Sequence, residues 1–479
     1  MNAPLSGVLE RKQAIMKASV GIDYGAYEQG TIAFDYERMM RDTPYTLSEI
    51  ATIQAQYGAG NTPLKELRRI TSLVRSISEP GHGARIFVKD EAQNDSGSFK
   101  ARRAAIAVYH AKKMGYKGVV AATSGNYGAA VASQAAKHGL ACIIVQECYD
   151  SQGVGQPEII EKARACEAYG AEVVQLSVGS ELFWVFLQIL EETGYFNASL
   201  YSPYGIAGIE TIGAELIRDC LAKTGRLPSA VVVTHAGGGN VTGTARGIRK
   251  TTDQTVEIIG ASVNLKGLHM GSDADFNKKS FTTGHTGFGI PFLVNPDRSD
   301  VPRSAARPLR YLDRYVTVTQ GSTFFVTEML SVLEGIERGP AGNTALAAAF
   351  AIARTMREDE ILIVQETEYT GAGKHHQAQL TFAKEKGVDV RFGDPKDEIP
   401  GTSIVLPSDI RLIGVEEVDL DRERFQRIKN AVGSRTMLDR IDVAYLAEET
   451  RWPISRVSEA LRALHIQAEV THDHKTTHF

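Results

Sequence analysis

Short apolar runs alternate with amphipathic stretches along most of the chain, and this alternation restricts the fold more than any other feature. The run 84–90 (ARIFVKD) precedes the helix-like KARRAAIAVYHAKKMG, and 118–124 (GVVAATS) precedes GAAVASQAAKHG. Six more such runs are found at 141–147, 171–177, 230–236, 257–263, 315–320 and 360–366. Continuous apolar strands between helices are typical of parallel sheets buried on both faces. The number of runs exceeds what one small sheet holds, so the pattern predicts two α/β domains with mostly parallel sheets.

The two ends of the chain differ from this alternating middle. Residues 1–50 are predicted to form a helical arm, 51–400 the core, and 401–479 a C-terminal helical tail. Within the tail, 443–464 (VAYLAEETRWPISRVSEALRAL) has the spacing of a helix-turn-helix. Its charge is mixed and not basic, so an accessory helical pair is favoured over a DNA-binding module.

Net charge and cysteine usage exclude several classes of protein. The formal net charge is −4, which gives no electrostatic reason to bind nucleic acid or anionic membrane. No apolar run approaches the roughly 20 residues that span a bilayer, and the N-terminus lacks the apolar centre of a signal peptide. The four cysteines have neither metal-pair spacing nor a disulfide framework; they are Cys142, Cys148, Cys166 and Cys220. We therefore expect a cytoplasmic protein with reduced thiols and no metal site.

Two glycine-rich stretches follow predicted strands, at the strand ends where open α/β sheets bind ligands. In 122–130 (ATSGNYGAA), backbone amides and hydroxyls at a helix start suit a carboxylate. In 234–247 (THAGGGNVTGTARG), three consecutive glycines let the backbone approach a phosphate closely. Either stretch alone could be a tight turn. Together with Lys100 in SGSFKARRA (96–104), they supply what a pyridoxal phosphate enzyme requires: an amine, a phosphate loop and a carboxylate loop.

These three stretches resemble the signatures of the fold type II pyridoxal phosphate family, which includes threonine synthase, threonine dehydratase and cysteine synthase. A fourth stretch, GPAGNTALAAAF (339–350), resembles a late helix of that family. The resemblance implies a tryptophan synthase beta-like fold with pyridoxal 5′-phosphate in the cleft between two α/β domains. It also implies that a smaller, movable subdomain occupies roughly 116–204.

The resemblance further implies roles for single residues. Lys100 would be the catalytic lysine and would bind the cofactor as a Schiff base, and Asn126 would hydrogen-bond the pyridine 3-hydroxyl. The substrate carboxylate would lie in a loop of four residues: Thr123, Ser124, Gly125 and Asn126. The phosphate would lie in a cup of five residues: Gly237, Gly238, Gly239, Asn240 and Val241. The partner of the pyridine nitrogen stays open between Glu366, Thr367 and Thr370. A carboxylate there would favour a protonated ring, whereas a hydroxyl would not.

Four longer stretches resemble a narrower family, the beta subunits of 2-amino-4-oxopentanoate thiolases. They are 145–159, 279–292, 297–315 and 365–377, within a resemblance that runs from about residue 10 to about residue 400. It implies that coenzyme A cleaves 2-amino-4-oxopentanoate to alanine and acetyl-CoA, in ornithine degradation. It also implies a small alpha subunit as partner and a homodimer of this chain. The alternative is a threonine synthase-like or ammonia-lyase enzyme that acts on an amino acid by elimination or replacement.

Four arginines gather near a predicted turn: Arg303, Arg307, Arg310 and Arg314. Guanidinium groups suit phosphate oxygens, so this cluster could bind the phosphates of coenzyme A. A solvated or interface patch is the favoured interpretation.

Overall fold

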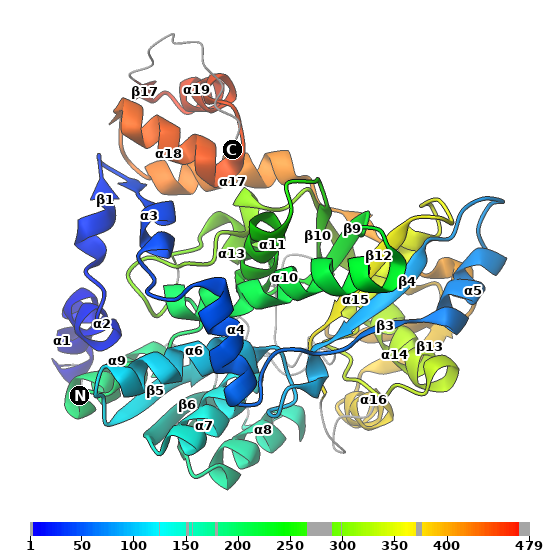
Figure 1. The fold of residues 1–479 in the computed structure, drawn as a ribbon, viewed down its shortest axis with the longest axis horizontal. Coiled ribbons are helices and arrows are strands. Elements are labelled where there is room, and N and C mark those ends of the chain that lie inside the picture. Colours follow the sequence, from blue (N-terminus) through cyan, green and yellow to red (C-terminus); the bar gives the residue numbers. More distant parts are fainter. Residues whose placement is uncertain are drawn as a thin grey trace.

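The computed structural model describes residues 3–123, 125–149, 153–155, 157–177, 181–265, 290–297, 299–369 and 376–468. Two separate sheets with helices around them form the body of the molecule, and a helical lobe projects from it at the top of Figure 1. All eight predicted strands are present close to their expected positions. The predicted architecture of two α/β units with mostly parallel sheets is therefore confirmed.

The larger sheet has seven strands in the order β15-β11-β10-β9-β12-β4-β3. Its five central strands are parallel, and the edge strands β3 and β15 pair antiparallel to their neighbours. The strands are β3 (Leu64–Glu66), β4 (Arg85–Asp90), β9 (Ala230–Thr234), β10 (Glu257–Val263), β11 (Arg314–Val318), β12 (Ile361–Glu366) and β15 (Glu416–Glu417). The central strands are rich in Val, Ile and Ala and are buried, as parallel strands covered on both faces must be.

The smaller sheet has four parallel strands in the order β7-β6-β5-β8. They are β5 (Gly118–Thr123), β6 (Ala141–Tyr149), β7 (Glu172–Ser177) and β8 (Phe196–Asn197). Its covering helices are α7 (Asn126–His138), α8 (Pro157–Ala168) and α9 (Glu181–Thr193). All of these elements lie inside the range proposed for the smaller subdomain.

A pair of tightly packed helices forms one layer over the larger sheet. These are α10 (Pro203–Thr224) and α11 (Gly239–Thr251), and α6 (Lys100–Lys113) packs on α10. The side chain of Ser202 caps α10 by accepting the amide of Gly205. A Cβ atom on Gly247 of α11 would overlap the carbonyl oxygen of Glu210 in α10, so the two backbones approach as only glycine permits. The opposite face is covered by α5 (Arg68–Ser76), α14 (Gln320–Glu334) and α15 (Thr344–Ala353).

The N-terminal segment is attached to the body and to the C-terminal lobe. It contains α1 (Ala3–Glu10), α2 (Lys12–Val20), β1 (Glu28–Gln29), β2 (Ala33–Phe34), α3 (Tyr36–Arg41) and α4 (Leu47–Gln56). Its side chains Val20, Phe34 and Tyr36 are buried in the main apolar cluster. The buried carboxylate of Asp442 accepts the amides of residues 31–33, which lead into β2. The arm predicted for residues 1–50 thus contributes to the core.

The C-terminal lobe contains α17 (Leu420–Val432), α18 (Arg440–Thr450) and α19 (Ile454–Ala463), with the short pair β16 (Met437–Leu438) and β17 (Gln467–Ala468). The predicted helix pair within 443–464 corresponds to α18 and α19. Before the lobe, α16 (His376–Glu385) and the parallel pair β13 (Asp389–Gly393) and β14 (Ser403–Pro407) pack beside α14. Residue 401, where the sequence predicted the tail to begin, lies between the two strands of this pair. None of the described helices is long and apolar enough to span a membrane.

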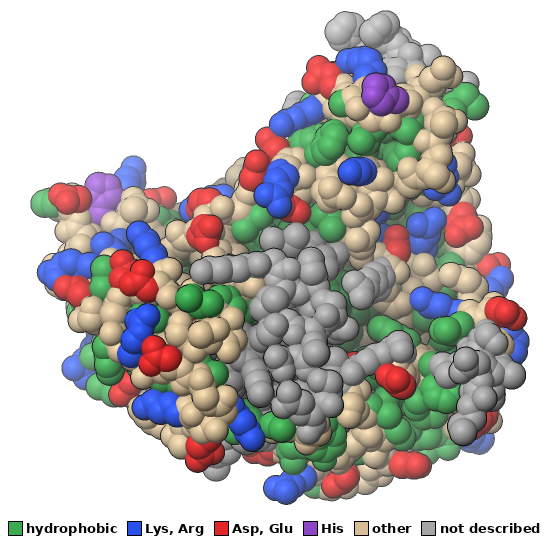
Figure 2. All heavy atoms as spheres, turned by 180° about the vertical axis from the view of Figure 1, so that it is seen from behind, with side chains coloured by type: hydrophobic (Ala, Val, Ile, Leu, Met, Phe, Trp, Pro, Cys, Tyr) green, Lys and Arg blue, Asp and Glu red, His purple; other side chains and the backbone are tan. Residues whose placement is uncertain are grey.

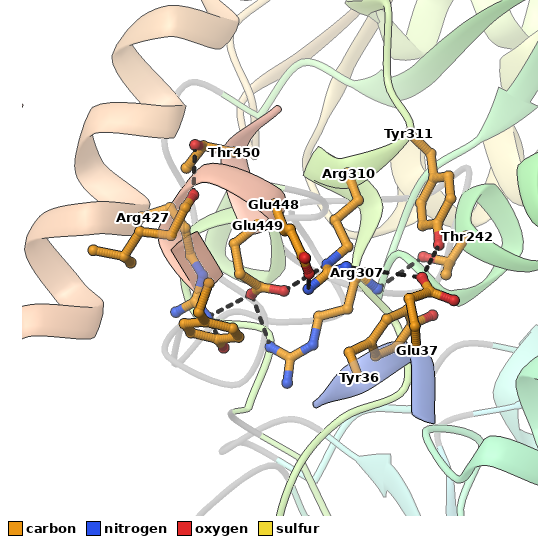
Figure 3. Close-up of polar contacts among 12 residues, drawn as sticks. Tyr36, Glu37, Thr242, Arg307, Arg310, Tyr311, Arg427, Glu448, Glu449 and Thr450 are labelled. Atoms are coloured by element: carbon orange, nitrogen blue, oxygen red, sulfur yellow. Dashed lines mark hydrogen bonds and ion pairs between the residues drawn. The ribbon is translucent and has the colours of Figure 1, made fainter. Parts of the chain in front are cut away.

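A buried ionic cluster joins the lobe to the body (Figure 3). The carboxylate of Glu449 in α18 accepts from Arg310 Nε at 2.8 Å, Arg427 Nη2 at 2.7 Å and Arg307 Nη1 at 3.3 Å. Glu449 is 3% exposed, and Arg307 and Arg310 are buried as well. The neighbouring Glu448 also reaches Arg310, but its side chain is largely exposed.

Candidate active site

A cavity of about 240 Å³ lies between the two sheets, and the three sequence motifs meet there. Eight of the predicted site residues line it: Lys100, Thr123, Gly125, Asn126, Gly237, Gly238, Gly239 and Asn240. Val241 is buried in the first turn of α11 and does not line the cavity. Ser124 and Thr370 lie outside the described residues. Most of the predicted constellation is therefore assembled in one place.

Lys100 lies at the first position of α6, where the chain enters the cavity. The preceding residue, Phe99, donates its amide to the carbonyl of Thr367 at 3.0 Å, just after β12. An antiparallel bridge between Ser98 and Glu368 supports the same crossing. The segment carrying Lys100 is therefore fastened to the end of a central strand, which fixes the point from which the side chain starts.

The loop between β5 and α7 is folded around the Thr123 side chain. Its Oγ1 accepts the amides of Gly125 at 3.0 Å and Gly128 at 3.3 Å. Asn126 follows as the first residue of α7, and its buried Oδ1 has no hydrogen-bond partner among the described residues. The loop therefore presents an amide side chain and a helix start to the cavity, and a helix start favours anions.

The glycine loop between β9 and α11 is closed in by bulky neighbours. Gly238 has φ +83°, and a Cβ atom there would lie 2.7 Å from Cγ of Pro308. A Cβ on Gly237 would overlap the Tyr201 hydroxyl, and one on Gly239 would overlap Arg103 Nη2. Thr242 Oγ1 donates to the Gly238 carbonyl at 2.8 Å and holds the turn. These glycines form a narrow cup at the N-terminus of α11, which suits a phosphate.

Unpaired buried polar atoms concentrate around this cavity. Six of the residues that line it carry such atoms, with no partner in the described part of the chain: Arg103, Asn126, Thr234, His235, Asn240 and Thr344. An unsatisfied buried polar group costs about 1–3 kcal/mol, so a cluster of them indicates a polar ligand that completes their hydrogen bonds. The cavity fits pyridoxal phosphate, which offers a phosphate, a hydroxyl and a ring nitrogen.

Glu366 is one of the three candidate partners of the pyridine nitrogen. It is the last residue of β12 and is buried, but it does not line the cavity. Its Oε2 accepts the amide of Glu368 at 3.1 Å and lies 3.9 Å from Arg338 Nε. Burial raises its pKa well above the ordinary value, and the nearby carboxylate of Asp90 acts in the same direction. Thr367, the next residue, lines the cavity. The partner of the pyridine nitrogen stays a prediction.

Among the lining residues that the sequence did not single out are Arg103, Tyr201 and Asp300. Asp300 is buried, and its carboxylate accepts a short hydrogen bond from Ser199 Oγ. Its backbone carbonyl accepts a hydrogen bond from Asn197 Nδ2 at 2.9 Å. Burial raises its pKa to about 6, while the Ser199 hydrogen bond opposes the rise. No motif surrounds Asp300, and no local signal distinguishes it from the other acidic residues of its segment.

The pKa of Asp300 leads to a prediction about stability. Because the folded pKa is above the ordinary value of 3.8, the folded state binds the extra proton, and stability falls as pH rises from about 4 to about 6. Asp300→Asn should therefore stabilise the cofactor-free chain by about 3 kcal/mol at pH 8, with little gain at pH 4. Urea unfolding at both pH values measures this. A gain that is equal at the two pH values would contradict the assignment.

The arginine cluster predicted as a solvated or interface patch is largely structural. Arg307 and Arg310 are buried and belong to the ionic cluster around Glu449, and Arg307 also contacts Asp297 at 2.7 Å. The predicted solvated or interface patch is therefore wrong for these two residues, because they are buried within the chain and share the carboxylate of Glu449, some 140 positions later in the sequence. Over the coloured side chains in Figure 2, acidic and basic groups are interspersed, with no extended region of one sign.

Comparisons with known proteins agree with this site. The family model described as "Pyridoxal-phosphate dependent enzyme" matches residues 55–365. The solved structure of a threonine deaminase from T.th. is 26% identical, with a TM-score of 0.51, and the match covers 68% of this chain and 97% of that one. An O-ureido-L-serine synthase structure, at 22% identity and TM-score 0.51, shares the fold. The chain belongs to the family of pyridoxal-phosphate-dependent enzymes and has their type II fold.

Curated relatives define its place more narrowly. The 2-amino-4-ketopentanoate thiolase beta subunit of Acetoanaerobium sticklandii is 63% identical over 448 residues, which is 93% of this chain and 95% of the relative. A second protein of that name, from an unknown prokaryotic organism, is 60% identical over 96% of this chain and 98% of its own length. The tryptophan synthase beta chain of Bacillus pumilus is 28% identical over 59% of this chain and 76% of its own. The resemblance drawn from the sequence is confirmed, and it extends into the C-terminal lobe.

Proposed function

We propose that the chain is the beta subunit of a thiolase that cleaves 2-amino-4-oxopentanoate with coenzyme A to give alanine and acetyl-CoA. The observation that carries the proposal is the identity of 63% and 60% to two such beta subunits along nearly the whole chain. The subunit name of these relatives supports an alpha subunit as partner. A homodimer, a cytoplasmic location and a role in ornithine degradation stay predictions.

The reaction forms one carbon–sulfur bond and breaks one carbon–carbon bond. The thiol sulfur of coenzyme A bonds to the γ-ketone carbon, and the bond between the β- and γ-carbons breaks. The electron pair of that bond passes to the β-carbon, which gains a proton and becomes the methyl group of alanine. Bound pyridoxal phosphate would supply the electron sink that makes the α-proton acidic. The following roles are proposed for residues of the cavity.

Lys100 is the proposed base for the α-proton, because it lines the cavity at the start of α6 and carries an amine. The Thr123–Asn126 loop would hold the substrate carboxylate at the start of α7, and the glycine cup would hold the phosphate. Asp300 lines the same cavity, and its pKa of about 6 lets it exchange a proton near neutral pH. We propose it as the group that relays the thiol proton to the β-carbon.

The chain's own thiols are unsuited to act as acyl carriers. All four cysteines are buried. Burial raises the pKa of Cys142, Cys148 and Cys166 to about 12, and it also raises that of Cys220. A thiol with so high a pKa is a poor nucleophile at neutral pH, because the thiolate is the reactive form. This supports direct attack by the thiol of coenzyme A.

The test is to incubate the cofactor-loaded chain, with and without the alpha subunit, with 2-amino-4-oxopentanoate and coenzyme A. Acetyl-CoA and alanine should form in equal amounts, and desulfo-coenzyme A should support no cleavage. The elimination enzyme is the alternative outcome: ammonia and a 2-oxo acid released from threonine without coenzyme A, and no acetyl-CoA, would overturn the thiolase proposal.

A further inference from the structure

Arg103 is a buried arginine that faces the glycine cup. It lies three residues after Lys100 in α6, so both side chains project from the same face of the helix toward the cavity. Arg103 is 2% exposed. Its guanidinium lies directly against Gly239, where a Cβ atom would overlap Nη2. Gly239 is also the first residue of α11, so the guanidinium lies at the N-terminus of that helix.

The protein gives this cation little compensation. Arg103 Nη1 donates to the carbonyl of Leu200 at 3.1 Å, and the guanidinium lies 5.6 Å from the centre of the Phe99 ring. Its Nε is buried and has no acceptor among the described residues. No carboxylate of the described residues forms an ion pair with the guanidinium either. Burial lowers its pKa to about 10, which leaves the group charged at neutral pH.

The adjacent Arg102 shows what a paired buried arginine looks like in this fold. Arg102 is also an arginine, immediately precedes Arg103 in α6 and is fully buried. Its Nε lies 2.7 Å from Glu91 and its Nη1 2.7 Å from Glu215. A buried charge without such partners is costly, and a helix N-terminus beside it repels a cation. An anion bound in the cup would contact both the Arg103 guanidinium and the start of α11, and would offset the positive charge of each.

We propose that Arg103 is a cationic ligand of the cofactor phosphate, acting across the cup from the Tyr201 hydroxyl. The glycine amides would hold the phosphate from below, while the guanidinium would neutralise one of its charges with charge-assisted hydrogen bonds. The inference rests on the cofactor that the family shares and is independent of the thiolase reaction.

The test compares pyridoxal phosphate with pyridoxal, which has the same ring and aldehyde but no phosphate. The cofactor-free full chain is titrated with each compound, and binding is followed by absorbance and by the melting temperature. Arg103→Met should weaken pyridoxal phosphate binding roughly 10- to 100-fold and leave pyridoxal binding nearly unchanged. Arg103→Lys keeps a charge and should recover part of the affinity. If Arg103→Met does not fold, the two titrations are compared between the wild type and Arg103→Lys.

The matched control is Arg249→Met, which removes an exposed arginine from the far end of α11 and should change neither affinity. Inorganic phosphate gives a second measurement: it should raise the melting temperature of the cofactor-free wild type more than that of Arg103→Lys.

Two results would overturn the proposal. Equal losses of affinity for pyridoxal and for pyridoxal phosphate would mean that Arg103 only maintains the cavity. Unchanged phosphate affinity with a raised KM for the amino acid would assign it to the substrate carboxylate.

Discussion

We expect Lys100→Ala to lower the rate of acetyl-CoA formation by roughly 10⁴-fold. The substitution removes the amine that starts α6 inside the cavity, and with it both the covalent attachment of the cofactor and the proposed base. The cup of Gly237–Gly239 is untouched, so the cofactor should still bind through its phosphate. Steady-state assays and an absorbance titration separate the two effects.

Two measurements can contradict this assignment. Borohydride reduction of the loaded wild type, followed by peptide mapping, should fix the cofactor to Lys100. A label on another lysine would exclude the proposed role. The control is Lys112→Ala, which removes an exposed lysine near the end of the same helix and should preserve turnover.

Glu449→Ala should destabilise the folded chain strongly. It would leave Arg307, Arg310 and Arg427 buried without their shared carboxylate. Removing one member of a buried ionic cluster costs about 3–5 kcal/mol, because the remaining charges stay desolvated. Urea unfolding of the full chain measures the loss.

The adjacent glutamate is a close control. Glu448 contacts Arg310 at 3.2 Å but is mostly exposed, so Glu448→Ala should cost less than about 1 kcal/mol. The two substitutions are identical in chemistry and differ mainly in burial. If both variants lost the same stability, the cluster of Figure 3 would not anchor the lobe.

The sequence predicted those parts of the molecule that depend on local pattern. Apolar runs gave the strands of both sheets, and the motifs around Lys100, Asn126 and Gly238 gave three walls of the cavity. These features could be predicted because a buried strand or a glycine turn restricts residue type within a few positions.

The parts that escaped prediction depend on contacts between distant segments. Arg102 and Arg103 are neighbours of the same type, yet the first has two carboxylate partners and the second faces the cup. Asp300 reaches the cavity from a segment without a motif. Arg307 was predicted to belong to a solvated or interface patch, because its partner Glu449 lies 142 positions later and gives no local signal. Only the tertiary fold distinguishes these cases.

The cup and the C-terminal lobe are connected through two consecutive residues. Pro308 packs against Gly238, and the Arg307 amide donates to Thr242 Oγ1, which itself holds the Gly238 carbonyl. The Arg307 side chain continues to Glu449. The backbone of the cup and the ionic cluster that holds the terminal helices therefore share one short run of contacts, and any coupling between cofactor binding and attachment of the lobe would act equally in both directions. The terminal helices, although far from the chemistry in the sequence, thus form part of the scaffold behind the phosphate cup.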